Sequence, residues 1–398
     1  MKITNAITSF KANKMSTMQA NYVDKKLKEA KNVDIITHDM TDRDGANSAL
    51  AMWEYLNNQG IQARVIISKK VPQALGLRNY DCNIVQALDK KEVDKITPDI
   101  AFCVDFGGSE RVLENIKEHI EKAPLVMGFD HHSEVDISRG NYVQFRRPLL
   151  DDEQVFTKAD FYSDMSAKSA TSIIYRFFEA LGKDIDSNQA YDLFFGLVDD
   201  VTKRNLVKCD GTNGTIIAQS ALYEDKNALE IYTKLREKLN DEQIKTIAKS
   251  VDLISSLNPA QQEFKDSLED RLQYSDNGKI AYIEIPADDS EWKSLDGDNT
   301  ITSTILNRFR QETLAKNDEV EAVICFYEAH GNYRLSAHTK NPNLLDFYKY
   351  VEENKIPNFT QNSGGHPTRG GGGIKTNDPN VCHNWVQNII SCDEFFEK

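Results

Sequence analysis

The stretch "PLVMGFDHH", residues 124–132, decides the fold class. It begins as a continuous apolar run and ends abruptly in Asp130, His131 and His132. An apolar run without alternation indicates a strand buried on both faces, which is typical of a parallel sheet covered by helices. Three earlier apolar runs, at 33–38, 62–68 and 98–106, have the same character and alternate with helical patterns. We therefore expect an N-terminal α/β domain with a parallel sheet.

Length, charge and cysteine usage narrow the class of protein. The 398 residues suffice for two or three domains, and no apolar run of 18 residues or secretory signal is recognised, so we expect a cytoplasmic protein. None of the six cysteines forms a CxxC pair, which disfavours structural zinc and a disulfide framework. The net charge of −14 disfavours long nucleic acid as a partner and fits a carboxylate-rich site completed by cations.

The second half of the chain predicts a different organisation. Residues 208–274 are charged and helical in pattern, and we expect a helical connector there. A smaller α/β domain is predicted from residue 275, with strands at 279–286, 321–329 and 332–339 and helices at 299–315 and 344–354. A glycine-rich loop is predicted at 362–375, before a last helix. The predicted domains are therefore 1–207, 208–274 and 275–398.

Polar side chains gather where the apolar segments end. These are His38, Asp42 and Asp44; Asp105; Asp130, His131 and His132; and Asp199 and Asp200. The carboxyl ends of parallel strands share one edge of a sheet, so at least three of these groups should converge. Converging carboxylates repel one another unless a cation joins them. Mixed imidazole and carboxylate ligands suit Mn²⁺, Zn²⁺ or Fe²⁺, and oxygen-rich sites favour Mn²⁺ or Mg²⁺. Four aspartates and two histidines are too many for one zinc and predict two divalent ions, Mn²⁺ in preference to Mg²⁺, which together would activate a water for attack at phosphorus.

The order of these motifs resembles the DHH phosphoesterase superfamily, and "SGGHP" at 363–367 resembles its DHHA1 substrate-binding domain. The chain departs from the usual three glycines by carrying Ser363 in place of the first. The resemblance implies a DHH domain, a linker and a DHHA1-like domain. It also implies that His38 and Asp42 hold one metal, that Asp105 bridges to the other, and that the second metal is held by Asp44, His131 and Asp200. Asp199 stays an alternative to Asp200.

The remaining roles also follow from the resemblance. His132 would act on the phosphate as a donor or acid, and Asp130 would orient an imidazole. Substrate would be bound by Gly364, Gly365 and His366, because glycine amides can approach phosphate closely. Arg334 and Ser336 are predicted to contact a second phosphate or a carboxyl-like group.

The predicted function is hydrolysis of phosphodiester or phosphomonoester bonds in short oligonucleotides or small nucleotides, as in nanoRNases. Two alternatives stay open: a RecJ-like exonuclease specific for single strands, and a nucleotide-binding sensor without turnover. No membrane partner is expected, and a homodimer stays open.

Two further expectations concern individual residues outside the predicted ligand set. His119 is predicted to be a solvated helix residue, while Ser169 and Thr171 are predicted to cap a helix near the site.

Overall fold

The structure is a computed structural model with two compact units. It describes residues 15–39, 41–67, 84–106, 112–132, 159–164, 166–255, 257–286, 289–295, 299–329, 332–340, 344–366, 368–376 and 378–397. The described residues up to Asp252 form the first unit, and those from Leu253 onward form the second. No helix in these ranges is both long and apolar enough to cross a membrane.

The first unit is built on a parallel sheet, as predicted. Its strands are β1 (Asn32–Thr37), β2 (Gln62–Ile67), β3 (Ile84–Gln86), β4 (Ile100–Val104), β5 (Leu125–Asp130) and β6 (Ala159–Ser163). They lie in the order β3-β2-β1-β4-β5-β6, and every neighbouring pair is parallel. The order reverses direction between β1 and β4. The carboxyl ends of two such strands border the crevice in which open α/β sheets bind ligands.

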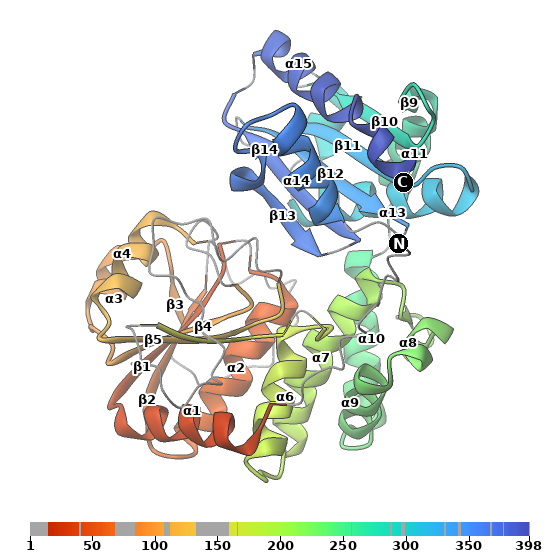
Figure 1. The fold of residues 1–398 in the computed structure, drawn as a ribbon. Helices are drawn as coiled ribbons and strands as arrows, with labels where there is room; N and C mark the ends of the chain where they lie inside the picture. The colour runs from red at the N-terminus through yellow and green to blue at the C-terminus, as the bar shows by residue number, and fades with distance from the viewer. Residues whose placement is uncertain are drawn as a thin grey trace, which may run out of the picture. The chain divides into compact units, whose positions relative to one another are not determined.

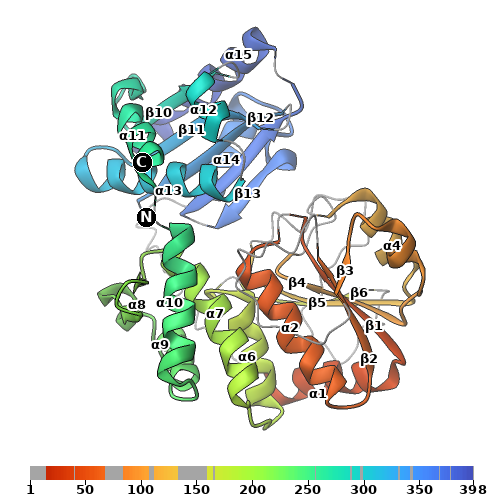
Figure 2. The ribbon, with the colours of Figure 1, turned by 180° about the vertical axis from the view of Figure 1, so that it is seen from behind.

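Helices cover both faces of this sheet (Figures 1 and 2). One face packs against α1 (Thr17–Glu29), α2 (Arg43–Asn57), α6 (Ala170–Ala180) and α7 (Ser187–Lys203) in the largest hydrophobic cluster. The other face packs against α3 (Lys90–Asp94) and α4 (Glu114–Lys122). Burial on both faces explains why the strands are mostly apolar in sequence rather than alternating.

The prediction that His119 is solvated is wrong. His119 is 1% exposed, because it shares the inward face of α4 with Ile116 and Ile120, at helical spacing. Its Nε2 lies 2.7 Å from Oδ2 of Asp34, and Arg64 pairs with the same carboxylate at 2.5–2.7 Å. A buried imidazole is accommodated here because a buried ion pair lies beside it.

The segment predicted as a helical connector starts differently. It opens with an antiparallel hairpin of β7 (Val207–Asp210) and β8 (Thr215–Ala218). The helices α8 (Ser220–Glu224), α9 (Lys226–Arg236) and α10 (Asp241–Ser255) follow, then α11 (Pro259–Ser267) and the 3-10 turn η3 (Leu268–Arg271). The wholly helical expectation was wrong at the hairpin, because four-residue strands are too short to show a periodicity. Along the chain, the first compact unit ends within this segment, at Asp252.

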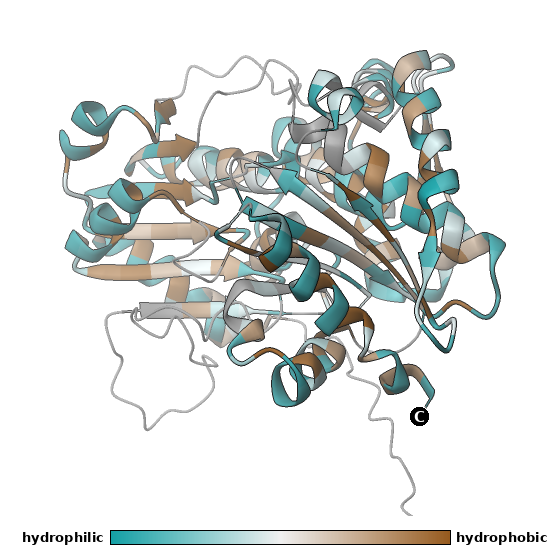
Figure 3. Ribbon diagram, turned by 90° about the horizontal axis from the view of Figure 1, so that it is seen from above, coloured by the Kyte–Doolittle hydropathy of each residue, from teal (hydrophilic) through white to brown (hydrophobic). Residues whose placement is uncertain are grey.

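The second unit contains a mixed six-stranded sheet. Its strands are β9 (Gln273–Tyr274), β10 (Ile280–Ile285), β11 (Ala322–Ala329), β12 (Asn332–Thr339), β13 (Ser363–His366) and β14 (Arg369–Ile374). They lie in the order β13-β14-β12-β11-β10-β9, in which only β10 and β11 are parallel. Many strands in Figure 3 are brown along much of their length, whereas helices alternate between teal and brown.

Helices also lie on both faces of the second sheet. One hydrophobic cluster includes α14 (Leu344–Asn354), α15 (Pro379–Ile390) and residues of the 3-10 turns η4 (Phe359–Asn362) and η5 (Asp393–Glu397). The other includes α11, α12 (Ser290–Leu295) and α13 (Asn299–Lys316). The observed α/β architecture, with a parallel-sheet unit followed by a smaller sheet unit, confirms the predicted fold class.

The glycine-rich segment at 362–375 was predicted as a loop, and that prediction is wrong. It forms β13 and β14, which pair with each other, and β14 also pairs with β12. Glycine is poor in strands by propensity, so the pattern did not indicate them. The close approach of β12 explains one of these glycines, because a Cβ at Gly373 would lie 2.9 Å from the carbonyl oxygen of Tyr333.

Candidate metal centre

Asp105 stands at the centre of the polar cluster that follows the switch point of the first sheet. It follows β4 directly, is 2% exposed and has a left-handed φ of 65°. Its Oδ1 lies 3.1 Å from Nε2 of His131, and its Oδ2 lies 3.4 Å from Nε2 of His38. Each oxygen of one carboxylate therefore faces a different imidazole. Left-handed backbone in a non-glycine residue is uncommon and often accompanies functional sites.

One group of possible ligands lies on the His38 side of Asp105. His38 follows β1, and Asp42 is the N-cap of α2, accepting from the amide of Gly45 at 3.1 Å. The ligand atoms of His38, Asp42 and Asp105 lie within 4.8 Å of one another. Glycine at position 45 leaves room for this carboxylate, because a Cβ there would lie 3.3 Å from Oδ2 of Asp105, a tight contact.

A second group lies on the other side and is fully buried. The ligand atoms of Asp44, His131 and Asp200 lie within 4.8 Å of one another. Asp44 is 0% exposed and accepts from the amides of Ala170 and Thr171, at 2.6 and 3.0 Å, and from the Thr171 hydroxyl at 2.8 Å. The N-terminus of α6 therefore fixes this carboxylate.

Ser169 caps α6 by accepting from the amide of Ser172 at 3.0 Å, which confirms its predicted role. Thr171 has a different role, since its side chain contacts Asp44. Close packing at this point requires Gly196 on α7. A Cβ there would lie 2.5 Å from Cγ2 of Thr171 and 3.1 Å from Oδ1 of Asp44.

The paired histidines differ in what they contact. His131 points its Nε2 at Asp105 and lies 3.6 Å from carboxylate oxygens of both Asp44 and Asp200. His132 instead places Nδ1 2.7 Å from Oδ1 of Asp130 and 3.7 Å from Oδ1 of Asp105. Asp130 also accepts from the backbone amide of His132 at 3.2 Å. Asp130 therefore contacts His132 through both its ring and its backbone, and the predicted role of Asp130 in orienting an imidazole stays a prediction.

The geometry separates Asp199 from Asp200. Asp199 pairs with the buried Arg43, whose Nη1 lies 2.9 Å from Oδ1, and with Lys203 at 2.7 Å. Asp200 turns Oδ2 toward His131 at 3.6 Å. Asp200 is thus the better placed of the two to share an ion with His131, although Asp199 also lies within reach of Asp42 and Asp200.

Two basic residues at the end of α7 also belong to the cluster and were not predicted from the sequence. They are Lys203, the last residue of α7, and Arg204, its C-cap. The ammonium of Lys203 lies 2.8 Å from Oδ2 of Asp42 and 3.3 Å from Oδ1 of Asp200. Arg204 lies 3.3 Å from Oδ2 of Asp200. Their spacing of three and four residues from Asp200 on a helix was the available signal.

The electrostatics of the cluster call for a cation. Burial raises the pKa of Asp44 well above its usual value, and the neighbouring carboxylates of Asp105 and Asp200 raise it further. Burial acts to raise the pKa of Asp42 as well. The charges and hydrogen bonds of Lys203 and His38 outweigh burial, so the pKa of Asp42 lies well below its usual value. Carboxylate oxygens and imidazole nitrogens suit Mn²⁺ and related ions, so the residues present fit the implied pair of metals.

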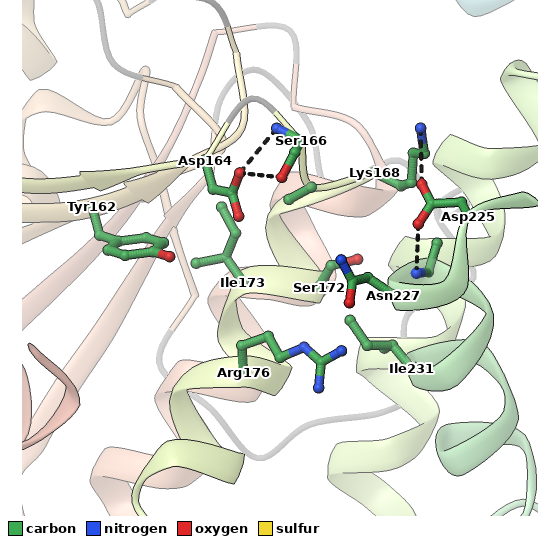
Figure 4. A pocket seen from close by; sticks show the side chains of 12 residues that line it. Tyr162, Asp164, Ser166, Lys168, Ser172, Ile173, Arg176, Asp225, Asn227 and Ile231 are labelled. Atoms are coloured by element: carbon green, nitrogen blue, oxygen red, sulfur yellow. Dashed lines mark hydrogen bonds and ion pairs between the residues drawn. The ribbon is translucent and has the colours of Figure 1, made fainter. Parts of the chain in front are cut away.

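Outside this cluster, a pocket lies between β6, α6 and α9 in the first unit (Figure 4). Its cations are already paired: Lys168 with Asp225 at 3.0 Å, and Arg176 with Glu230 at 3.1 Å. Asp164 accepts from the amide and hydroxyl of Ser166. The pocket therefore presents balanced charge rather than a site for an anion.

The residues predicted to bind substrate lie in the second unit. Arg334 and Ser336 point to the same face of β12, since they alternate with the buried Tyr333, Leu335 and Ala337. Gly364, Gly365 and His366 belong to β13, which is separated from β12 only by β14. The sheet thus brings the predicted residues onto strands close to one another.

Fold and site together define an α/β protein with a metal-type cluster at a sheet switch point, and comparisons with known proteins agree. The family described as "DHH family, N-terminal domain" matches residues 32–197. This part of the chain, less than half of its length, is similar to a DHH N-terminal domain. The matched range includes His38, Asp105 and His131 but ends before Asp200. No curated protein matches the sequence.

A solved structure shares the fold over nearly the whole chain. An exopolyphosphatase-related protein from Bacteroides fragilis is 14% identical, with a TM-score of 0.68 over 96% of this chain and 98% of that one. RecJ from Thermus thermophilus, in complex with Mn²⁺, is also 14% identical, over 96% of this chain and 55% of that one, with a TM-score of 0.47. The first similarity establishes a shared fold for the full length of the chain.

Proposed function

We propose that the protein is a phosphoesterase that depends on two divalent metal ions, with Mn²⁺ preferred over Mg²⁺. The observation that carries this proposal is the position of Asp105, whose two oxygens face His131 and His38 at 3.1 and 3.4 Å. One ion would be held by His38, Asp42 and Asp105. The other would be held by Asp44, His131 and Asp200 together with Asp105. A carboxylate shared by two ligand groups would hold two ions close together, as two-metal hydrolysis of phosphoesters needs.

When bound, such ions would neutralise phosphate charge and activate a water for in-line attack. The chain's own residues supply orientation and protons. Asp130 fixes the ring of His132 through Nδ1, so Nε2 is the atom that would exchange a proton with the phosphoester. The amides at the start of α6 hold Asp44 rigidly, which keeps the second ligand group in place before any substrate arrives.

The proposed substrates are short oligonucleotides or small nucleotides. Their phosphates would be bound in the second unit by Arg334, Ser336, Gly364, Gly365 and His366. The net charge of −14 supports a small substrate over a long nucleic acid. Since the structurally similar B. fragilis protein is described as exopolyphosphatase-related, inorganic polyphosphate belongs among the compounds to be tested.

The test is a hydrolysis assay in Mn²⁺ with five substrates in parallel. They are a labelled RNA dinucleotide, a 30-residue single strand, a cyclic dinucleotide, 3'-phosphoadenosine 5'-phosphate and inorganic polyphosphate. We expect turnover of the dinucleotide or of a small nucleotide, with the 30-residue strand intact. The variant Asp105→Asn, assayed beside the wild type, identifies activity that arises from this site.

The other outcomes decide between the alternatives. Processive degradation of the 30-residue strand would replace the proposal with a RecJ-like exonuclease. Release of phosphate from polyphosphate alone would move the substrate class away from nucleotides. Metal binding without hydrolysis of any of the five compounds would favour a sensor.

A further inference from the structure

Arg310 on α13 is a buried cation without a counter-ion in the described part of the second unit. It is 5% exposed, and α13 packs against β11 and β12. Its Nε and Nη1 have no hydrogen-bond partner, and no carboxylate of the described residues forms an ion pair with it. Its polar neighbour is the thiol of Cys325, whose pKa burial raises to about 11 although Arg310 lowers it.

Such an arrangement is costly. A guanidinium removed from water loses its hydration, and the loss is offset only when an anion and further hydrogen bonds replace it. Buried polar atoms in native proteins nearly always have partners, so guanidinium donors without one among the described residues point to a bound ion or ligand. For a guanidinium that partner is an oxyanion.

The surroundings of Arg310 include a buried imidazole and a second guanidinium. His338 is 7% exposed, and its Nδ1 has no partner among the described residues. It stands opposite Val323 of β11 and Arg369 of β14 in the sheet register, so the three share the face that α13 covers. Burial lowers the pKa of His338 to about 2, and the charges of Arg310 and Arg369 lower it further. The imidazole is therefore neutral and able to donate one hydrogen bond.

The same face of the sheet carries a glycine, which has no side chain, next to these groups. Gly371 stands opposite Ser336 and therefore faces the same way as Arg334, Ser336 and His338. A Cβ at Gly371 would meet, within 4 Å, only the carbonyl oxygen of Leu335 at 3.4 Å. Among the described residues no side chain comes within 4 Å of that Cβ position, and β14 is half-buried along its length.

We propose that Arg310 is the innermost residue of a phosphoryl-binding subsite on the α13 face of this sheet, shared with His338 and Arg369. The inference rests on the proposed function, because the phosphoryl group would belong to the hydrolase's substrate. It adds a residue from α13 to the set expected from sequence on β12 and β13. Guanidinium groups bind phosphoryl oxygens through paired N–H donors, and several on one face favour a ligand with more than one phosphate.

The test measures binding and stability in the full-length protein with EDTA present, so that no metal contributes. The probe is inorganic tripolyphosphate, titrated by calorimetry. We compare the wild type with Arg310→Met, which removes the charge at similar volume, and with Arg308→Met, which makes the same change two residues away on the same helix. We expect Arg310→Met to weaken binding at least about tenfold, as loss of a charge-assisted contact does, and Arg308→Met to bind like the wild type.

Thermal unfolding without ligand distinguishes a binding residue from a structural one. If Arg310 is uncompensated until an anion binds, Arg310→Met removes an unfavourable buried charge. The Tm of the ligand-free variant should then be higher than that of the ligand-free wild type by about 2 °C or more. Wild-type affinity in Arg310→Met would overturn the proposal, and so would a fall in its Tm.

The outcome for the proposed function is separate. Asp105→Asn should keep tripolyphosphate binding although it loses hydrolysis. A wild-type protein that binds tripolyphosphate through Arg310 but hydrolyses nothing in Mn²⁺ would refute the proposed function alone. Hydrolysis with no effect of Arg310→Met on binding would refute the subsite alone.

Discussion

Substitution of Asp105 by asparagine separates its role as a ligand from its role in the backbone. Asparagine keeps the shape of the side chain and tolerates the left-handed φ of 65° at this position. It removes the negative charge and one of the two oxygens that face His38 and His131. The fold should therefore remain while both ligand groups lose their shared member.

The expected loss can be estimated from the geometry. Removing a group that only supports a metal ligand costs about 10- to 100-fold in affinity or activity. A shared ligand contacts both ions, so we expect kcat in Asp105→Asn to fall by at least about 100-fold. Asp105→Ala should lose as much activity and, in addition, about 1 kcal/mol of stability, because alanine disfavours left-handed backbone.

The assay is the initial rate in saturating Mn²⁺, on the substrate that the wild type turns over best, with Mn²⁺ affinity measured on the same preparations. Chemical denaturation without metal supplies the stability of each variant. Asp270→Asn is the matched control, since Asp270 is exposed on η3 in the other unit. Wild-type rate and Mn²⁺ affinity in Asp105→Asn would refute the shared-ligand argument.

Three further predictions concern other parts of the first unit. Arg64→Met should lower the free energy of unfolding by about 3 kcal/mol, because it leaves the buried carboxylate of Asp34 without its guanidinium partner. Chemical denaturation measures this free energy, and an unchanged value would contradict the prediction. Gly196→Ala should cost about 1–3 kcal/mol and weaken Mn²⁺ binding, because the new methyl group meets Thr171 at 2.5 Å; calorimetry with Mn²⁺ checks it. Lys234 and Arg176 lower the pKa of Glu230 to about 2 in the folded protein, from 4.5 in the unfolded chain. The ionised carboxylate therefore stabilises the fold fully above about pH 4.5, and this stabilisation is lost as the pH falls toward 2. Screening limits it to about 0.5 kcal/mol, so Glu230→Gln should destabilise slightly at pH 7 and not at pH 2.5.

Much of the fold was predictable because buried elements show a recognisable pattern of apolar residues in the sequence. The mostly apolar strands β1, β2, β4 and β5 predicted a parallel sheet, and their polar ends predicted where the functional residues would gather. Strands such as β3, β7 and β8 have three or four residues, too few for a pattern to be recognised. The strands β13 and β14 consist mostly of glycine, whose propensity argues against the structure that the neighbouring strand imposes.

The candidate site was predictable for similar reasons, and only in part. His38, Asp105 and His131 stand at strand ends, which the sequence makes visible. Lys203 reaches the cluster from a helix and depends on how α2 and α7 pack, which no local pattern reveals. Arg310 was missed because a buried arginine on a helix looks like a solvated one until its surroundings are known.

The central claim is that two ions share one carboxylate at Asp105, and electron paramagnetic resonance of the Mn²⁺-loaded protein tests it most directly. The account predicts two Mn²⁺ per chain, with the spectrum of a coupled pair that Asp105→Asn abolishes. Binding of a single Mn²⁺, or of two that give only the signal of isolated ions, would contradict it.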